Sequence, residues 1–313
     1  MILRFLAFLA LAACSAGLTG CKQQSSPSQA GTAAKQTGAT PESITFPELS
    51  PAKVIQPGIQ FQEATLQREG VPMKVWYYQP EKAADKLALV LVPPAGSTLF
   101  AGMDLGEGDR PEHFPYAKAG FAVASFEIDG NVPDGAPDAA VLKGAREFRA
   151  ADAGLANAKV ALDFILAKVP NIDPNRIYVA GHSSAGTLAL LVAEHEPRIK
   201  ACVAFAPCTD VEARLRPVTP RLDKAIPGYK DFIRTNSPKT NADKLKCPVF
   251  LFHAKDDNDI PLRESTEFAA LVKQTNPNVT LVTVARGGHH TSMIQEGIPK
   301  AIEWLQKLPK AGS

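Results

Sequence analysis

The chain has 313 residues, of which 45% are hydrophobic and 21% charged, which excludes a wholly disordered protein and suffices for one large α/β domain. Its 34 basic and 32 acidic residues nearly cancel, so the net charge of +2 gives no reason to expect nucleic acid as a partner. Five cysteines are too few for a disulfide scaffold, and no Cys-x-x-Cys pair suggests a zinc site.

Residues 1–20 are typical of a secretory signal peptide. Arg4 precedes the apolar run 5–13, which is shorter than the roughly 20 apolar residues that span a bilayer. The segment ends in Leu18-Thr19-Gly20-Cys21, which resembles the bacterial lipoprotein processing box. We expect lipid attachment at Cys21, because a box ending at Cys14 would leave an unusually short signal; the alternative is an ordinary signal peptide with accidental cysteines. The resemblance implies an exported protein that acyl chains hold at a membrane.

Residues 21–56 predict a flexible linker. Ser, Gln, Thr, Ala, Pro and Gly dominate its first half, which shows no apolar period and cannot bury enough surface to offset chain entropy. Apolar residues return in its last third, which we expect to lie along the domain surface. A single domain is expected over 57–313, because this part holds neither an internal repeat nor a second core.

The remainder alternates short apolar strands with helices. An antiparallel pair is predicted at 59–66 and 73–78, with its turn at 70–72. Continuous apolar runs predict buried strands at 87–92, 121–126, 177–180, 202–205, 249–252 and 279–284. Helices are expected at 145–168, 185–195, 262–274 and 297–307. This alternation predicts an α/β fold with a mostly parallel central sheet and helices on both faces.

The segment 209–243 interrupts the alternation. It is long and rich in Pro, and an insert of this kind in a compact domain is often a lid over a functional site. Its seven basic residues outnumber its five acidic ones, which could favour an anionic substrate but is more typical of a solvated basic face. We therefore expect a short lid-like insert.

A predicted buried strand, a tight turn and a helix form the setting of a nucleophile elbow, Gly-x-Ser-x-Gly. Ser183 takes the nucleophile position, and Gly181 lets the backbone turn sharply. Ala185 stands where the pattern has its second glycine; the place requires a small side chain, and Gly186 follows. Ser184 is the alternative nucleophile. The non-catalytic interpretation is that the serine at this turn only caps the N-terminus of the following helix.

The strand predicted at 249–252 ends in a cluster of acids. A catalytic histidine needs a carboxylate that selects its tautomer and stabilises its charged form. Asp257 fits the usual spacing of such a loop, Asp256 is the alternative, and Asp259 is the least favoured. The other interpretation is a solvated loop or a cation site, but the twelve-residue calcium loop with its Gly and closing Glu is absent.

The stretch Gly287-Gly288-His289-His290 follows the last predicted strand. The glycines let the loop approach the sheet edge closely, and His289 directly after them is the expected general base. His290 is the alternative. A histidine pair can bind a metal, but no other His or Cys has suitable spacing nearby, so we expect neither a metal nor a cofactor.

The three candidates follow one another as Ser, Asp and His, each after a predicted strand, which is the α/β-hydrolase order. Residues 59–308 resemble the branch that contains the dienelactone hydrolases and the prolyl-oligopeptidase (S9) catalytic domain. The likeness is carried by Gly181–Gly186, the loop 253–261 and Gly287–His289. The chain also departs from both groups. Dienelactone hydrolases use Cys where Ser183 stands, and prolyl oligopeptidases carry an N-terminal propeller for which this chain has no room.

The resemblance implies a serine hydrolase that cleaves esters or peptides through an acyl-enzyme, with His289 as the base. Such an enzyme stabilises an oxyanion with backbone amides. We expect the amide of Ser184 to be one donor and that of Ala95 or Gly96 to be the other, because the two prolines before Ala95 have no N–H.

Three functions remain open from the sequence. A carboxylesterase-like enzyme acting on a small ester is favoured. The alternatives are a prolyl-oligopeptidase-like peptidase acting on short peptides and a hydrolase fold kept as a non-catalytic binding protein. Cys202, Cys208 and Cys247 remain after processing at Cys21, and this odd number in an exported protein implies at least one free or intermolecular thiol.

Overall fold

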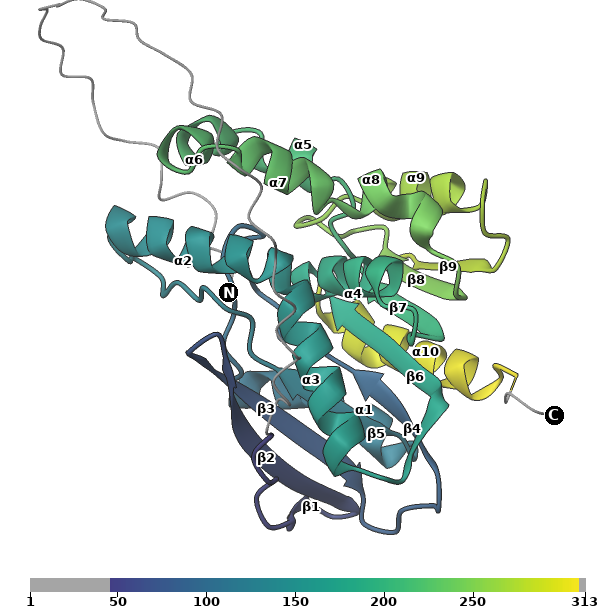
Figure 1. Ribbon diagram of the computed structural model, residues 1–313. Coiled ribbons are helices and arrows are strands. Elements are labelled where there is room, and N and C mark those ends of the chain that lie inside the picture. The colour runs from purple at the N-terminus through teal and green to yellow at the C-terminus, as the bar shows by residue number, and fades with distance from the viewer. Residues whose placement is uncertain (1–45, 310–313) are drawn as a thin grey trace, which may run out of the picture. The chain divides into compact units, whose positions relative to one another are not determined.

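The computed structural model of the protein describes residues 46–309 (Figure 1). The predicted signal peptide, Cys21 and most of the predicted linker lie outside these residues. Within 46–309, no helix is both long and apolar enough to cross a membrane.

A nine-stranded sheet forms the centre of the described domain, with the strand order β1-β2-β3-β5-β4-β6-β7-β8-β9. The first pairings, from β1 through β3 to β5, are antiparallel, and all later pairings are parallel. The strands are β1 (Lys53–Gln56), β2 (Ile59–Arg68), β3 (Val71–Pro80), β4 (Leu87–Leu91), β5 (Ala122–Phe126), β6 (Ile172–His182), β7 (Ala201–Phe205), β8 (Val249–Ala254) and β9 (Val279–Val284).

Helices cover both faces of the sheet (Figure 1). One apolar cluster packs α3 (Leu155–Lys168), α4 (Ser184–His195) and α9 (Arg263–Val272) on one face, and a second packs α1 (Arg110–Lys118) and α10 (Ile298–Gln306) on the other. Successive residues of a strand point to opposite faces. The predicted mostly parallel α/β architecture is confirmed.

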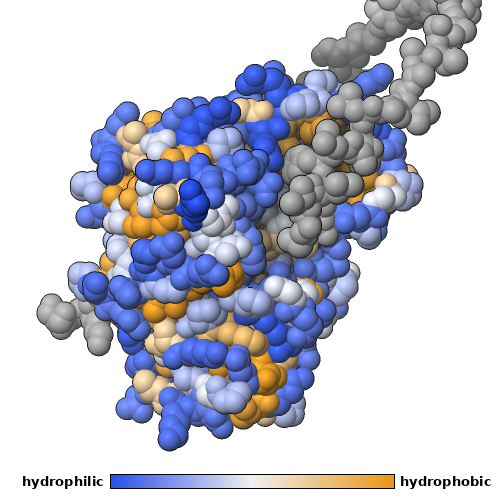
Figure 2. Space-filling model, turned by 180° about the vertical axis from the view of Figure 1, so that it is seen from behind, coloured by the Kyte–Doolittle hydropathy of each residue, from blue (hydrophilic) through white to orange (hydrophobic). Residues whose placement is uncertain are grey.

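The surface of the domain is mainly polar. On the face seen in Figure 2, hydrophilic residues dominate and hydrophobic ones form small groups between them. Among the described residues, Val54 is the large hydrophobic side chain that is clearly exposed, at 54%. Scattered exposure of this kind is normal for a folded domain.

The predicted linker extends too far. Residues 46–56 belong to the compact domain, whose boundary lies at Phe46. The ring of Phe46 packs edge-on against that of Phe164 in α3, 5.5 Å between centroids, and β1 adds a strand to the sheet. The domain therefore begins before the expected residue 57, since β1 pairs with β2. The sequence does not show this strand, because four residues are too few for a recognisable period.

The helix predicted over 145–168 is two helices. α2 (Asp138–Ala150) ends before a short 3₁₀ turn, and α3 begins at Leu155. The backbone of Ala153 and Gly154 is left-handed, with φ of 57° and 91°, so a continuous helix is impossible here. α1 was not predicted, since Pro111 and Pro115 obscure its helical pattern.

The insert 209–243 folds into short helices that pack above α2 (Figure 1). Their apolar side chains form a third cluster with Ala145 of α2 and with Ile260. Arg149 of α2 donates to the carbonyl of Pro227 at 2.9 Å, and the Tyr229 hydroxyl donates to that of Phe100 at 3.0 Å. The helices are α5 (Val211–Leu215), α6 (Thr219–Ala225), α7 (Tyr229–Thr235) and α8 (Pro238–Asn241).

One buried acid in α4 is unsatisfied. Glu194 is 7% exposed, and neither of its carboxylate oxygens has a hydrogen-bond partner among the described residues. Burial raises the pKa of Glu194 well above its ordinary value of 4.5, and the nearby charge of Lys244 offsets only part of this effect. Ionisation of Glu194 therefore lowers the free energy of unfolding.

We predict that Glu194→Gln stabilises the protein increasingly as the pH rises. With a raised folded-state pKa, the stability associated with Glu194 is fully present below about pH 4.5 and is lost as the pH rises through the folded pKa. The neutral amide avoids this loss. Urea unfolding should therefore give equal stabilities near pH 4 and a gain of about 1 kcal/mol or more for Glu194→Gln at pH 8.

Glu196→Gln provides the opposite control. A hydrogen bond from Arg198 lowers the pKa of Glu196, so its contribution to stability is present above its unfolded pKa and is lost as the pH falls through its folded pKa. That variant should be less stable than the wild type at pH 8. A Glu194→Gln effect that does not change with pH would contradict the burial argument.

Candidate active site

The turn between β6 and α4 holds Ser183 in a strained conformation. β6 ends at His182, α4 begins at Ser184, and Ser183 between them has φ 57° and ψ −122°. This region of backbone space is rarely occupied by residues with a side chain, and such strain clusters at functional sites. The amide of Ser183 donates to the carbonyl of Phe205 on β7 at 2.9 Å, which ties the turn to the next strand.

Small residues make the turn possible. A Cβ at Gly181 would lie 2.2 Å from the carbonyl oxygen of Ala185, and one at Gly186 would lie 3.0 Å from that of Gly181. Ala185 is itself fully buried, so a methyl side chain fits at this position. The departure from the Gly-x-Ser-x-Gly pattern at Ala185 is therefore compatible with the elbow.

The acid loop and the histidine loop meet through Asp257. His289 Nδ1 lies 2.7 Å from Asp257 Oδ2, while Oδ1 accepts the amides of Asp259 at 2.9 Å and Ile260 at 3.0 Å. His253 Nε2 lies 3.2 Å from Oδ2, and the carboxylate is fully buried. Burial alone would raise the pKa of Asp257, but the hydrogen bonds from the two histidines and the amide of Ile260 outweigh it and hold that pKa far below its usual range.

Asp256 contacts the same loop at a different point. Its two carboxylate oxygens accept the amides of Gly287 at 3.1 Å and Gly288 at 2.8 Å. Asp256 thus binds the backbone that precedes His289, whereas Asp257 binds the imidazole. Gly287 has φ 117°, and a Cβ there would lie 2.8 Å from that of Ser292, so the close approach expected of the glycines is present.

His182 joins the elbow to the histidine loop. Its Nε2 lies 3.0 Å from the carbonyl oxygen of His289, and the two ring centroids are 4.5 Å apart. Because His182 directly precedes Ser183, this contact places Ser183 and His289 at the same end of the sheet. No hydrogen bond joins the Ser183 hydroxyl to the imidazole within the described residues; such bonds often tighten only when substrate is bound.

Glu112 of α1 contacts the other ring nitrogen of His182. Glu112 Oε1 lies 3.6 Å from His182 Nδ1, and the side chains are 13% and 5% exposed. Burial would raise the pKa of Glu112, but the adjacent His182 lowers it. Sequence reasoning missed Glu112, since α1 itself was not predicted. His290, the alternative base, is exposed, and its ring packs edge-on against that of His182, with 5.8 Å between centroids.

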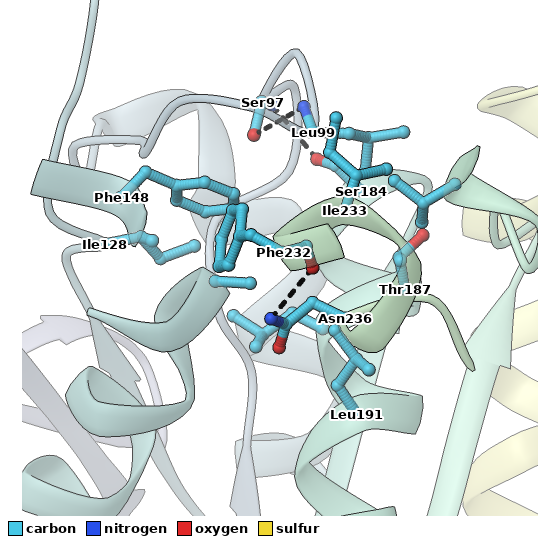
Figure 3. A pocket seen from close by; sticks show the side chains of 13 residues that line it. Ser97, Leu99, Ile128, Phe148, Ser184, Thr187, Leu191, Phe232, Ile233 and Asn236 are labelled. Atoms are coloured by element: carbon cyan, nitrogen blue, oxygen red, sulfur yellow. Dashed lines mark hydrogen bonds between the residues drawn. The ribbon is translucent and has the colours of Figure 1, made fainter. Parts of the chain in front are cut away.

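The predicted oxyanion donors lie beside the elbow. The amides of Gly96 and Ser97 both donate to the Oγ of Ser184 at 3.0 Å. Figure 3 shows Ser97 beside Ser184. The amide of Gly96 is thus already engaged, whereas that of Ala95 has no acceptor among residues 46–309. Of the two predicted loop donors, the geometry favours Ala95.

A small cavity adjoins Ser184. It has a volume of about 30 Å³ and lies between the loop after β4, α4 and the insert (Figure 3). Its lining is mostly apolar and includes Leu99, Phe148, Thr187, Leu191, Phe232 and Ile233. Across the described chain, no group of three or more His, Cys, Asp or Glu side chains is arranged to hold a metal ion.

The described part of the chain contains three free thiols. Cys202, Cys208 and Cys247 form no disulfide with one another. Burial raises the pKa of Cys208 to about 12 and that of Cys247 to about 11, so both thiols stay protonated at neutral pH. Neither thiol is therefore suited to act as a nucleophile.

Comparison with known proteins places this geometry in a family. The prolyl oligopeptidase family (peptidase S9) matches residues 114–310, a stretch that includes the elbow, the acid loop and the histidine loop. The chain belongs to this family. The resemblance to the S9 catalytic domain drawn from the sequence is confirmed.

Relatives with named activities include both esterases and peptidases. Acetyl esterase Axe7A of Xylanibacter ruminicola is 27% identical over 264 residues, which are 75% of this chain and 56% of that protein. The chain therefore spans little more than half the length of this relative.

Two solved structures show the shared α/β-hydrolase fold at low identity. An acetyl xylan esterase from Paenibacillus sp. R4 superposes with a TM-score of 0.60 at 17% identity, over 82% of this chain and 88% of that one. The Pyrococcus horikoshii acylaminoacyl peptidase superposes with a TM-score of 0.62 at 17% identity, over 82% of this chain and 43% of that one. The predicted α/β-hydrolase fold is confirmed.

Proposed function

We propose that the protein is a serine hydrolase with the triad Ser183, His289 and Asp257. The observation that carries this proposal is the 2.7 Å contact between Asp257 and His289 Nδ1, next to the strained turn at Ser183. With Nδ1–H donated to the carboxylate, the lone pair of Nε2 is free to accept a proton, as a general base requires.

The reaction follows from these roles. The Oγ of Ser183 attacks the carbonyl carbon of the substrate while His289 Nε2 accepts its proton, and the imidazolium then gives that proton to the departing alcohol. Water attacks the resulting acyl-enzyme with His289 again as base, and the proton returns to Ser183. Asp257 stays ionised throughout and stabilises the imidazolium. The amides of Ser184 and Ala95 stabilise the oxyanion in both steps.

We propose esters of short acyl groups as the substrates. The relative named as an acetyl esterase supports this preference, while peptides remain the alternative because the family is named for peptidases. The departure at Ala185 from the Gly-x-Ser-x-Gly pattern would favour a non-catalytic binding protein if a methyl group did not fit there. Ala185 is fully buried, however, and a close backbone contact that requires glycine lies at the next residue, Gly186. That departure gives no support for lost catalysis.

We also propose that the protein is exported and attached to a membrane through Cys21. The support is the sequence alone: an apolar run of signal-peptide length followed by Leu18-Thr19-Gly20-Cys21. The acyl chains would anchor the protein while its domain stays in water.

We predict that a fluorophosphonate probe labels the wild-type protein and that Ser183→Ala abolishes the labelling, because the probe bonds covalently to an activated serine. Hydrolysis should fall by about 10⁴-fold or more in the same variant. Peptide mapping of the labelled protein provides the control. Labelling that persists in Ser183→Ala would transfer the nucleophile to another residue, with Ser184 the first to examine.

We predict that Asp257→Asn lowers kcat by about 10⁴-fold, because an amide no longer holds His289 in the productive tautomer. Asp256→Asn is the matched control. It retains an acceptor for the loop amides and should lower kcat less than about tenfold, as expected for weakening hydrogen bonds worth about 1 kcal/mol each. Initial rates on p-nitrophenyl acetate measure both. Equal losses would refute the distinct roles of the two acids.

We predict a higher kcat/KM for p-nitrophenyl acetate than for p-nitrophenyl octanoate or aminoacyl-p-nitroanilides. A single panel at constant enzyme concentration ranks these substrates, with Ser183→Ala as the blank. Faster cleavage of an anilide than of any ester would assign a peptidase.

We predict that cells fed a labelled fatty acid incorporate it into the wild-type protein and not into Cys21→Ala. Cys14→Ala tests the alternative box and should retain the label. Incorporation that survives Cys21→Ala and disappears in Cys14→Ala would move the processing site.

A further inference from the structure

One side chain connects the two halves of the oxyanion site. The loop after β4 and the nucleophile elbow are separated by almost ninety residues, and the Oγ of Ser184 accepts the amides of Gly96 and Ser97 across that gap, each at 3.0 Å. Ser184 is 8% exposed, whereas Gly96 is exposed and Ser97 is half-buried, so these bonds are partly shielded from water. Two such bonds to one buried acceptor restrict the groups that they join.

The same loop is restrained on its other side. Val92, the residue after β4, donates to the carbonyl of Ala124 at 2.8 Å, and Pro93 and Pro94 have fixed φ angles. Gly96 has φ 103°, a left-handed turn that brings two successive amides toward one acceptor atom. Ala95 therefore lies between two fixed points, the prolines before it and the Ser184 hydroxyl after it.

We propose that the Ser184 hydroxyl positions the oxyanion hole. Its two bonds hold the loop so that the amide of Ala95 converges with the backbone amide of Ser184 on one developing oxyanion. The inference rests on the proposed serine hydrolase activity and deepens it. It gives Ser184 a side-chain role apart from its backbone role. Donors that are fixed before reaction stabilise the transition state most, because they need no rearrangement during the chemical step.

The arrangement also explains the serine pair at the elbow. Both acceptor positions of the Ser184 hydroxyl are occupied by backbone amides, and the group points to the cavity beside the loop (Figure 3). Ser183 supplies the free hydroxyl, and Ser184 supplies the bound one. The two neighbouring serines thus perform separate tasks.

The test compares Ser184→Ala with Ser184→Thr. Ser184→Ala keeps the backbone amide and removes the acceptor, so kcat on p-nitrophenyl acetate should fall about 10- to 100-fold, below the loss for deleting a donor outright, with KM within about threefold. The rate of fluorophosphonate labelling should fall in parallel, since its phosphoryl oxygen occupies the same hole. Ser184→Thr retains the hydroxyl, and the 30 Å³ cavity offers room for its methyl group, so it should recover most of the lost kcat.

Ser237→Ala controls for the loss of a buried hydroxyl. The Oγ of Ser237 accepts the amide of Val211 at 3.0 Å and donates to the carbonyl of Thr209 at 3.1 Å, at the base of the insert. Its removal should lower thermal stability about as much as Ser184→Ala does, with kcat unchanged. Thermal unfolding of all variants verifies that each is folded at the assay temperature.

The outcomes separate the two proposals. An active wild-type enzyme whose kcat is unaffected by Ser184→Ala overturns the positioning role alone. So does a Thr variant as slow as the Ala variant, or a Ser237→Ala variant with the same loss of kcat. A wild-type protein that neither hydrolyses an ester or anilide nor takes up the probe overturns the serine hydrolase and, with it, this inference.

Discussion

The buried carboxylate of Asp257 is the interaction on which the site depends. A charge without access to water is costly unless every acceptor position is satisfied, and here two imidazoles and two backbone amides surround it. The donors come from β8, from the loop after it and from the loop after β9. Through Ile260, the same network also reaches the apolar cluster under the insert. The donors that satisfy this one charge therefore connect the histidine loop, the sheet and the insert.

The parallel sheet makes this meeting possible. β6, β8 and β9 run in the same direction and stay in register, with His182 opposite Phe205, Phe205 opposite Phe252 and Phe252 opposite Val282. Their carboxyl ends thus open at one edge, where ligands of α/β sheets bind. Residues far apart in the sequence arrive there as neighbours. They lie side by side in chain order, because β6, β7, β8 and β9 are successive neighbours in the sheet.

Much of this could be predicted because each strand is an apolar run and each loop after it is rich in Gly, Asp, Ser or His. Spacing favoured Asp257 but left Asp256 as an alternative, since neighbouring residues differ mainly in where their side chains point. Only the structure shows that Asp257 contacts the imidazole of His289 and Asp256 the backbone before it. Glu112 was not predicted as a site residue because the two prolines in its helix, α1, obscure the helical pattern. The hydrogen bond from the Gly96 amide to Ser184 was not predicted either, because the sequence does not show which side chain accepts a given backbone amide.

The backbone at Ser183 has a consequence beyond its role in exposing a hydroxyl. Holding a residue with a Cβ at φ 57° and ψ −122° costs on the order of 1–3 kcal/mol, which the surrounding sheet and helix must supply. Glycine would adopt this geometry at lower cost, so the most stable sequence for this fold and the reactive one differ at that position. The turn therefore holds its serine at the expense of folding free energy.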